Sequence, residues 1–206
     1  MGYVNNFIIG ILDFFYKLTG NYGVALILFT VIVKLILYPL THQQFKALKD
    51  QQRIQPELNK LREKYKDDPQ RLNQEMMELY RRHKINPLGG CLPLLIQFPI
   101  LAILYSAINA YSSKFANASF LWIKSLASPD LPLLIIYGIS MVASSFLSSP
   151  LSDDPSQRSS QLFMNIGLPI VFTILFRGFP SAFILYWFVF NILTTIQQVY
   201  VMRVLK

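Results

Sequence analysis

Apolar residues follow one another in five long runs along this chain, and polar residues gather between the runs. The runs cover residues 23–40, 91–110, 131–149, 162–176 and 181–202, of which the fourth is short. About 20 apolar residues are enough to cross a bilayer as an α-helix, because a helix satisfies its own backbone hydrogen bonds. The pattern therefore predicts an all-α polytopic membrane protein with five transmembrane helices.

Residues 3–18 precede the first run and have a different pattern. Apolar residues recur at helical spacing, while Asn6, Gly10, Asp13 and Lys17 occupy the opposite side. This predicts an amphipathic helix that lies in the membrane interface. A signal peptide is the competing interpretation, but no basic region precedes the apolar residues and no small-residue cleavage site follows them.

Residues 41–84 form the long polar segment, with eleven Lys or Arg against seven acids. Its apolar positions repeat helically in two runs, Ile54, Leu58, Leu61 and Tyr65, then Leu72, Met76, Leu79 and Tyr80. Between the runs, Asp68 can cap a new helix and Pro69 suits its first position. The segment therefore predicts an antiparallel helical hairpin, in which Pro56 should kink or restart the first helix. The hairpin either receives a partner or is simply a solvated structural element.

The basic residues predict the orientation in the membrane. With the hairpin in the cytoplasm, fourteen Lys or Arg lie on the cytoplasmic side. The other side has only Lys17, Lys114, Lys124 and Arg177. The positive-inside rule then places the N-terminus outside and the C-terminus in the cytoplasm.

Lys34 lies inside the first apolar run, where a charge costs about 2.5–3.5 kcal/mol on insertion scales. Two interpretations of this residue remain open. The side chain can extend toward the interface near Leu40, roughly 9 Å away along a helix that rises ~1.5 Å per residue. Alternatively, it faces a wet cavity enclosed by the other spans and offers that cavity a positive charge.

Amides and hydroxyls in the other runs are candidates for lining such a cavity. The side chains suited to hydrating a groove and holding an anionic group are Lys34, Gln97, Asn109, Asn165, Thr173, Asn191 and Gln198. A stripe of Tyr137, Ser140, Ser144 and Ser148 favours helix packing, and Ser140 and Ser144 are also candidates for the groove. For each of these residues, holding helices together is the competing role.

Several classes of function are disfavoured. The chain has no zinc-protease, nucleotide-binding or hydrolase motif, so we expect neither an enzyme nor a cofactor. His42 and His83 lack ligand spacing, which argues against a metal site, and Cys91 as the single cysteine excludes an internal disulfide. The net charge of +8 comes without an interleaved aromatic platform, so anionic lipids are expected partners and a specific nucleic acid is not.

Three stretches of the sequence resemble the YidC-type membrane protein insertases, which are related to the Oxa proteins of mitochondria and the Albino proteins of chloroplasts. The stretches are VKLILYPLT at residues 33–41, the hairpin and second span at residues 55–108, and FPSAFILYWFVFNILTTIQQ at residues 179–198. They extend over most of the chain, and the middle stretch is the most specific.

The resemblance implies a single insertase core domain over residues 1–206, in a bacterial cell membrane. Its groove would open to the cytosol and to lipid, and it would insert and help fold membrane proteins without ATP. The implied partners are nascent single-span or short-tailed membrane proteins, with the Sec translocon, the ribosome and the signal recognition particle pathway as further candidates. Lys34 matches the family's first-span basic residue, commonly Arg, and Gln97 and Trp187 lie in matched motifs as groove-lining residues. The resemblance also suggests a minimal bacterial form without a large outer domain or a long basic tail.

The alternative function is a small polytopic transporter or channel. Such a protein would be expected to contain repeated halves with interrupted helices at matching positions. Five unequal spans with one hairpin insert do not have that pattern.

Overall fold

The computed structural model describes residues 2–85, 92–149 and 155–204. Within these ranges the chain is helical, apart from turns and one isolated β-bridge between Phe120 and Ile123. The chain divides into two compact units, which are described separately below. The first combines Met1–Leu37 with Pro99–Val199, and the second combines Tyr38–Phe98 with Tyr200–Lys206.

Long apolar helices make up most of the first unit. They are the beginning of α2 (Tyr22–Lys64), the end of α4 (Leu92–Ala110), α6 (Leu131–Ser148) and most of α9 (Ser181–Val204). The unit also contains two shorter helices, the polar α7 (Pro155–Leu162) and the apolar α8 (Leu168–Leu175). Over the described residues, four stretches are long and apolar enough to cross a membrane: Tyr22–Lys64, Leu131–Ser148, Arg158–Gly178 and Ser181–Arg203. Gln97–Ala110 is a shorter apolar helix. The prediction of an all-α polytopic membrane protein is confirmed.

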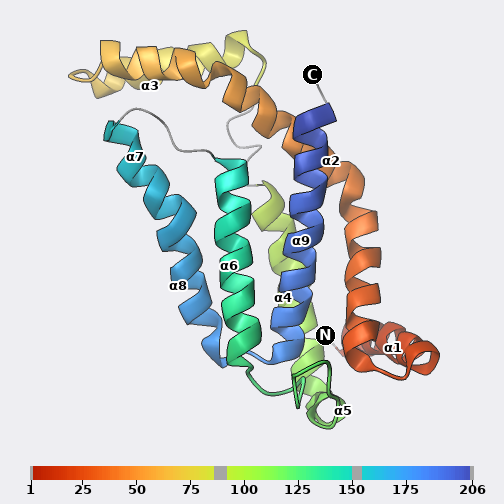
Figure 1. The fold of residues 1–206 in the computed structure, drawn as a ribbon. Helices are drawn as coiled ribbons and strands as arrows, with labels where there is room; N and C mark the ends of the chain where they lie inside the picture. The colour runs from red at the N-terminus through yellow and green to blue at the C-terminus, as the bar shows by residue number, and fades with distance from the viewer. Residues whose placement is uncertain (1, 86–91, 150–154, 205–206) are drawn as a thin grey trace. The chain divides into compact units, whose positions relative to one another are not determined.

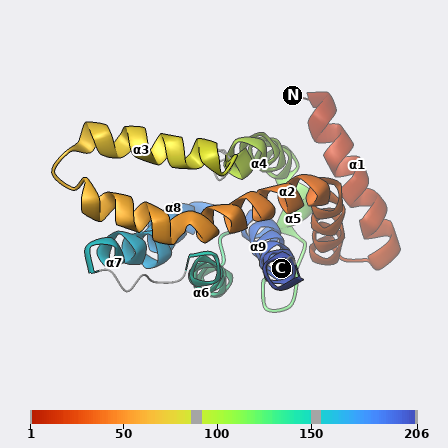
Figure 2. The same ribbon diagram turned by 90° about the horizontal axis from the view of Figure 1, so that it is seen from above.

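Helix α1 (Gly2–Thr19) runs crosswise to the long helices at one end of this unit, beside the beginning of α2. Figure 2 shows it along its length in the view where α6 and α9 are seen end-on, whereas Figure 1 shows α6 and α9 upright. Its Ile9 and Leu12 are buried, while Tyr3, Phe7, Phe14 and Leu18 are exposed. A helix in this orientation, with apolar residues left uncovered, fits the membrane interface.

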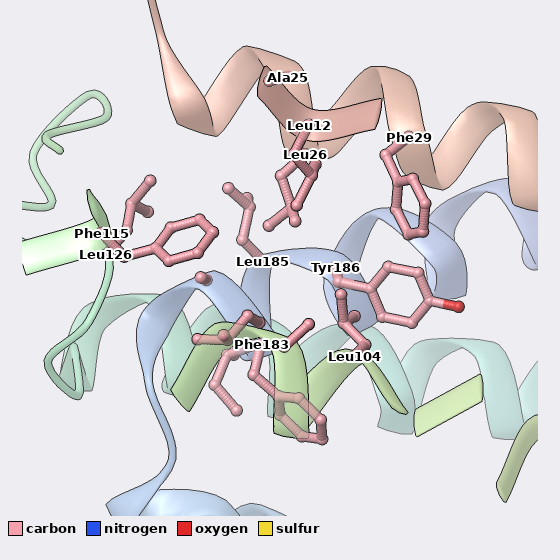
Figure 3. Packing of buried hydrophobic residues seen from close by; sticks show 14 of the residues in the cluster. Leu12, Ala25, Leu26, Phe29, Leu104, Phe115, Leu126, Phe183, Leu185 and Tyr186 are labelled. Carbon is pink, nitrogen blue, oxygen red and sulfur yellow. The ribbon is translucent and has the colours of Figure 1, made fainter. Parts of the chain in front are cut away.

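Side chains from six helices, α6 among them, and a loop share one apolar core in the first unit (Figure 3). Leu12 of α1 and Leu26 and Phe29 of α2 meet Leu104 of α4 and Tyr186 of α9. The segment after α4 also contributes: α5 (Ser112–Ala116) supplies Phe115 to the same core, and the loop supplies Leu126. Van der Waals packing of these side chains holds α1 and this loop against the long helices.

Main-chain contacts fix the loop of residues 117–130 in place. The backbone N–H groups of Ser181 and Ala182, at the start of α9, donate to the carbonyls of Ser128 and Leu126 at 2.9 Å each. Gly23 lies so close to this loop that an added Cβ would be 2.3 Å from the ring of Phe120. The sequence pattern predicts only a loop at residues 111–130, and the short helix α5 is a finding of the structure.

The second unit contains a helical hairpin built from the end of α2 and from α3 (Pro69–Arg82). Asp68 caps α3 by accepting a hydrogen bond from the backbone N–H of Arg71 at 3.0 Å, and Pro69 occupies the first helical position, as predicted. Ile54, Leu58 and Leu79 form its buried core, with partly buried apolar neighbours Leu61, Met76, Tyr80 and Ile85. The predicted packing of apolar stripes between two helices is therefore present.

Two boundaries differ from those that the sequence predicts. Helix α2 continues through Pro39 and Pro56 to Lys64, so the first helix neither ends after Pro39 nor restarts at Pro56. The missing proline N–H removes one hydrogen bond, which the neighbouring turns and the packing of Ile54 and Leu58 outweigh. The fourth span is also longer than residues 162–176, because helix begins at Pro155 and continues through a π-helical segment, η2 (Phe163–Gly167).

Candidate functional site

Lys34 points into the first unit, toward α9. Its side chain is 5% exposed, and its ammonium donates a hydrogen bond to the Thr194 hydroxyl at 2.8 Å. The same nitrogen lies 4.9 Å from the centre of the Phe190 ring, one helical turn earlier on α9. Of the two interpretations left open above, an ammonium extended to the interface near Leu40 is not the conformation observed.

The protein compensates this charge only in part. Across residues 2–85, 92–149 and 155–204, no carboxylate lies within ion-pair distance of Lys34. An ammonium has three N–H donors; one donates to Thr194 and the charge faces the Phe190 ring, so at least one donor has no hydrogen-bond acceptor among the described residues. A buried cation of this kind favours the approach of water or of an acidic group.

Polar residues of α9 bind two different neighbours. Thr194 accepts from Lys34 of α2, whereas Asn191 and Gln198 contact α6. The Asn191 amide donates to Ser144 Oγ at 3.2 Å, and the Gln198 amide donates to Ser148 Oγ at 2.9 Å. These contacts match the helix-packing role that the sequence left open for the amides and serines.

Trp187 and Asn191 lie one turn apart on α9, and each has a buried polar atom without a hydrogen-bond partner among the described residues. The atoms are the indole Nε1 of Trp187, a donor, and the amide Oδ1 of Asn191, an acceptor. The Trp187 ring packs near Phe176, Phe183 and Phe190. Phe190 also contacts Lys34, so the cation and the unpaired donor adjoin the same aromatic ring.

Three other candidates are engaged with their own or neighbouring helices. Asn165 is buried in η2 and donates to the carbonyl of Ser149 at 2.7 Å. The hydroxyl of Thr173 donates to the carbonyl of Pro169 at 2.8 Å, and that of Ser140 donates to Tyr137 O at 2.7 Å. Hydroxyls bonded to the preceding turn are common in apolar helices and do not require a groove.

The two remaining candidates are described separately. Asn109 is exposed on α4. Gln97 is buried and belongs to the second compact unit. The structure therefore gathers Lys34, Trp187, Asn191, Ser144 and Gln198 around α9, and it does so through direct contacts or a shared ring.

Sequence reasoning missed the partners of Lys34. Thr194 and Phe190 are four residues apart and hence on one face of α9, which is the signal that could have suggested them. Nothing in the periodicity of α9 indicates that this face meets α2. No group of three or more His, Cys, Asp or Glu suited to a metal ion occurs in the part of the chain that the structure describes.

Comparisons with known proteins identify the same family as the sequence motifs do. The family model "60Kd inner membrane protein" matches residues 14–206. The chain is 48% identical over 195 residues to the "Membrane protein insertase YidC" of Geobacter sulfurreducens, covering 93% of this chain and 36% of the relative. It is 38% identical over 213 residues to the protein of the same name from Nitratidesulfovibrio vulgaris, covering 98% of this chain and 39% of the relative. The chain thus spans little more than a third of the length of these relatives.

Two solved structures are similar in fold. One, described as an active YidC insertase with its first transmembrane domain resolved, has a TM-score of 0.75 at 34% identity, over 93% of this chain and 45% of that chain. The other, YidC from Thermotoga maritima, has a TM-score of 0.53 at 25% identity, over 93% of this chain and 39% of that chain. Taken together with the match over residues 14–206, these similarities show that the chain belongs to the 60Kd inner membrane protein family, to which the YidC insertases belong.

Proposed function

We propose that this chain inserts integral membrane proteins into the bilayer and helps them fold, as the names of its relatives suggest. The observation that carries the proposal is the buried ammonium of Lys34, which has one protein hydrogen bond and no acidic partner among the described residues. A cation kept in this state costs stability and has free donors to offer. The relatives are named insertases, which favours this function over the small transporter.

The first step is capture of a short acidic tail by a hydrophilic groove that includes Lys34. The carboxylate takes up the ammonium's unused donors, and the attraction is stronger there than in water because the surroundings are apolar. Trp187 Nε1 and Asn191 Oδ1, which have no partner among the described residues, offer a further donor and acceptor for water or peptide groups. These groups shorten the purely apolar distance that the tail has to cross.

The second step is release of the adjoining apolar span into lipid. Exposed apolar side chains on α6 and α8, such as Ile135, Ile139, Val171 and Ile174, offer a surface along which the span can slide. Transfer of its surface out of water, worth ~25 cal/mol per Å², supplies the free energy without ATP. The proposal requires no covalent chemistry and no cofactor.

The charged hairpin of α2 and α3 would receive the incoming segment or the factor that delivers it. Arg53, Arg82 and their acidic neighbours form exposed ion pairs that can exchange partners at little cost. Nascent single-span or short-tailed membrane proteins are the proposed substrates. The Sec translocon, the ribosome and the signal recognition particle pathway are proposed as delivery routes.

We also propose that the N-terminus is outside a bacterial cell membrane and the C-terminus is cytoplasmic. Helix α1, α5 and the turn between α8 and α9 lie at one end of the first unit (Figure 1), and they carry Lys17, Lys114 and Arg177. These are three of the four basic residues expected on the outer side. Labelling Lys17→Cys and Arg203→Cys, each in a Cys91→Ser background, from either side of intact cells would test this orientation.

The test of the insertase proposal uses purified protein in liposomes and a single-span substrate with an acidic tail. Lys34→Ala should lower insertion at least about tenfold, which corresponds to ~1.4 kcal/mol, whereas Lys34→Arg should retain most of it. A substrate with its tail acids changed to amides should respond much less to Lys34→Ala. Equal insertion by the wild type and Lys34→Ala would exclude the role of this charge, and no insertion by the wild-type protein would contradict the function itself.

A further inference from the structure

A polar cavity of about 220 Å³ lies at the end of the first unit where α1 meets α2 and α5. It is lined by residues of three segments, including Tyr16, Asn21, Lys114, Asn117 and Ser119. The proposed insertase function uses none of these residues. Cavities for whole drug-sized ligands are generally larger, at about 300–1,000 Å³, so this one suits a small polar group.

The walls of the cavity are held by contacts between distant parts of the chain. Asn21 donates to the carbonyl of Ser119 at 3.0 Å and accepts from the backbone N–H of Gly23 at 2.8 Å. Tyr16 and Tyr22 stack with ring centres 4.2 Å apart, and the Tyr22 hydroxyl donates to Asp13 at 2.8 Å. The cavity is therefore formed before any ligand binds.

Positive charge exceeds negative charge at this place. The Lys114 ammonium pairs with Asp13 at 2.5 Å, and one carboxylate occupies only part of its donor capacity. Burial alone would raise the pKa of Asp13, but hydrogen bonds from Lys114 and Tyr22 and the charges of Lys114 and Lys17 lower it below its ordinary value. Two lysines thus act on one ionised acid, and the excess favours an anionic ligand.

The position on α1 identifies the kind of anion. Helix α1 lies across the long helices and exposes Phe14 and Leu18 next to Tyr16 and Lys17. Apolar, tyrosine and lysine side chains in this mixture are typical of the level where acyl chains meet headgroups. A ligand that combines a phosphate with a hydrocarbon chain matches both surfaces.

We propose that this cavity binds the phosphate of a phospholipid from the leaflet in which α1 lies, with anionic lipids preferred. Lys114 contacts the phosphate while it remains paired with Asp13, and the amides of Asn21 and Asn117 lie beside it. The acyl chains extend along the uncovered apolar residues of α1. The bound lipid then contacts both α1 and the α5 segment and adds to the direct contacts between them.

The test places opposite charges at Asn117, which is exposed and lines the cavity without a described partner. Native mass spectrometry of the purified full chain would measure retention of phosphatidylglycerol against phosphatidylcholine. Asn117→Asp should lower phosphatidylglycerol retention about fivefold and Asn117→Lys should raise it, as expected for ~1 kcal/mol between charges near 4 Å in water. Asn73→Asp and Asn73→Lys, at an exposed position on α3, are the matched controls and should change nothing.

Each outcome decides the proposal. Melting without added lipid should be the same for the wild type and both Asn117 variants, so a change in lipid retention cannot come from misfolding. Equal phosphatidylglycerol retention by both Asn117 variants would overturn the site. If inorganic phosphate binds as tightly as phosphatidylglycerol and with the same dependence on Asn117, the cavity is a free-anion site and the lipid assignment is wrong.

Discussion

Two lysines in the same compact unit differ in their exposure and in whether they have an acidic partner. Lys114 lies on α5 at the end of the unit, its side chain is 36% exposed, and it pairs with Asp13. Lys34 lies in the apolar part of α2 and is 5% exposed; its hydrogen-bond partner is Thr194 and its aromatic partner is Phe190. The partly exposed lysine has an acidic partner, and the buried lysine has none in the part of the chain that the structure describes.

Under the proposed function, this difference separates a structural charge, Lys114, from a functional one, Lys34. An exposed ion pair contributes about 0–1 kcal/mol and fixes a local geometry, here the attachment of α1 to α5. A buried charge without an acidic partner has a desolvation cost that its few polar contacts do not offset, so it lowers the stability of the fold. Departures from stable packing of this kind are expected where a protein acts. Substitutions at the two lysines and their partners test the distinction.

The largest effect is expected from Lys34→Met, which removes the buried charge and keeps the apolar stem. The free energy of unfolding should rise by about 2–3 kcal/mol, because insertion of that charge costs ~2.5–3.5 kcal/mol, while insertion activity should fall. Chemical denaturation in detergent and the liposome assay would measure both. Lys124→Met, at an exposed position, is the control and should change neither by much. A Lys34→Met protein that is less stable than the wild type would show that the charge is structural.

Thr194→Val should have the next largest effect, since it removes the hydrogen-bond acceptor of Lys34. We expect a loss of about 1 kcal/mol in unfolding free energy, within the range measured for polar contacts between membrane helices. The loss should disappear in the Lys34→Met background. Thr195→Val is the matched control, because its hydroxyl donates only to the carbonyl of Asn191. Equal losses in both backgrounds would mean that Thr194 stabilises something other than Lys34.

Lys114→Met should act in the opposite direction from Lys34→Met. It removes the ion-pair partner of Asp13, which keeps its hydrogen bond from Tyr22, so the free energy of unfolding should fall by about 1 kcal/mol or less for a partly exposed pair. Hydrogen exchange of α1 amides should accelerate more than exchange in α9, because the pair holds α1 locally. Unchanged exchange in α1 would show that the apolar contacts of Leu12 and Ile9 hold the helix by themselves.

The smallest effect concerns pH. The folded state lowers the pKa of Asp13 below its ordinary value of 3.8, so its ionised form stabilises the fold above that value. The contribution is lost as pH falls below 3.8 and through the lowered pKa. Wild type and Asp13→Asn should therefore differ in unfolding free energy near neutral pH and converge in acid. A difference that persists at the lowest pH would come from packing instead of charge.

Local features of the fold could be predicted from the sequence, whereas contacts between segments could not. The Asp68 cap, the apolar stripes of the hairpin and the amphipathic α1 depend on residues close together in the chain. The continuation of α2 through Pro56 depends on packing against α3, which periodicity does not report. For the same reason, the sequence identified Lys34 as unusual without indicating that Thr194 lies beside it. The five-helix count, the single domain over residues 1–206 and the groove remain predictions.

Under the proposed function, the backbone hydrogen bonds from Ser181 and Ala182 to the loop of residues 117–130 bear on the route of a client protein. Such bonds depend on main-chain atoms, so side-chain substitutions in the loop leave their donors and acceptors in place. They join the turn that begins α9 to the loop that follows α5. A proposed client that reaches Lys34 would then find straight passage beyond this end obstructed, and its exit would be lateral, between helices and into the lipid.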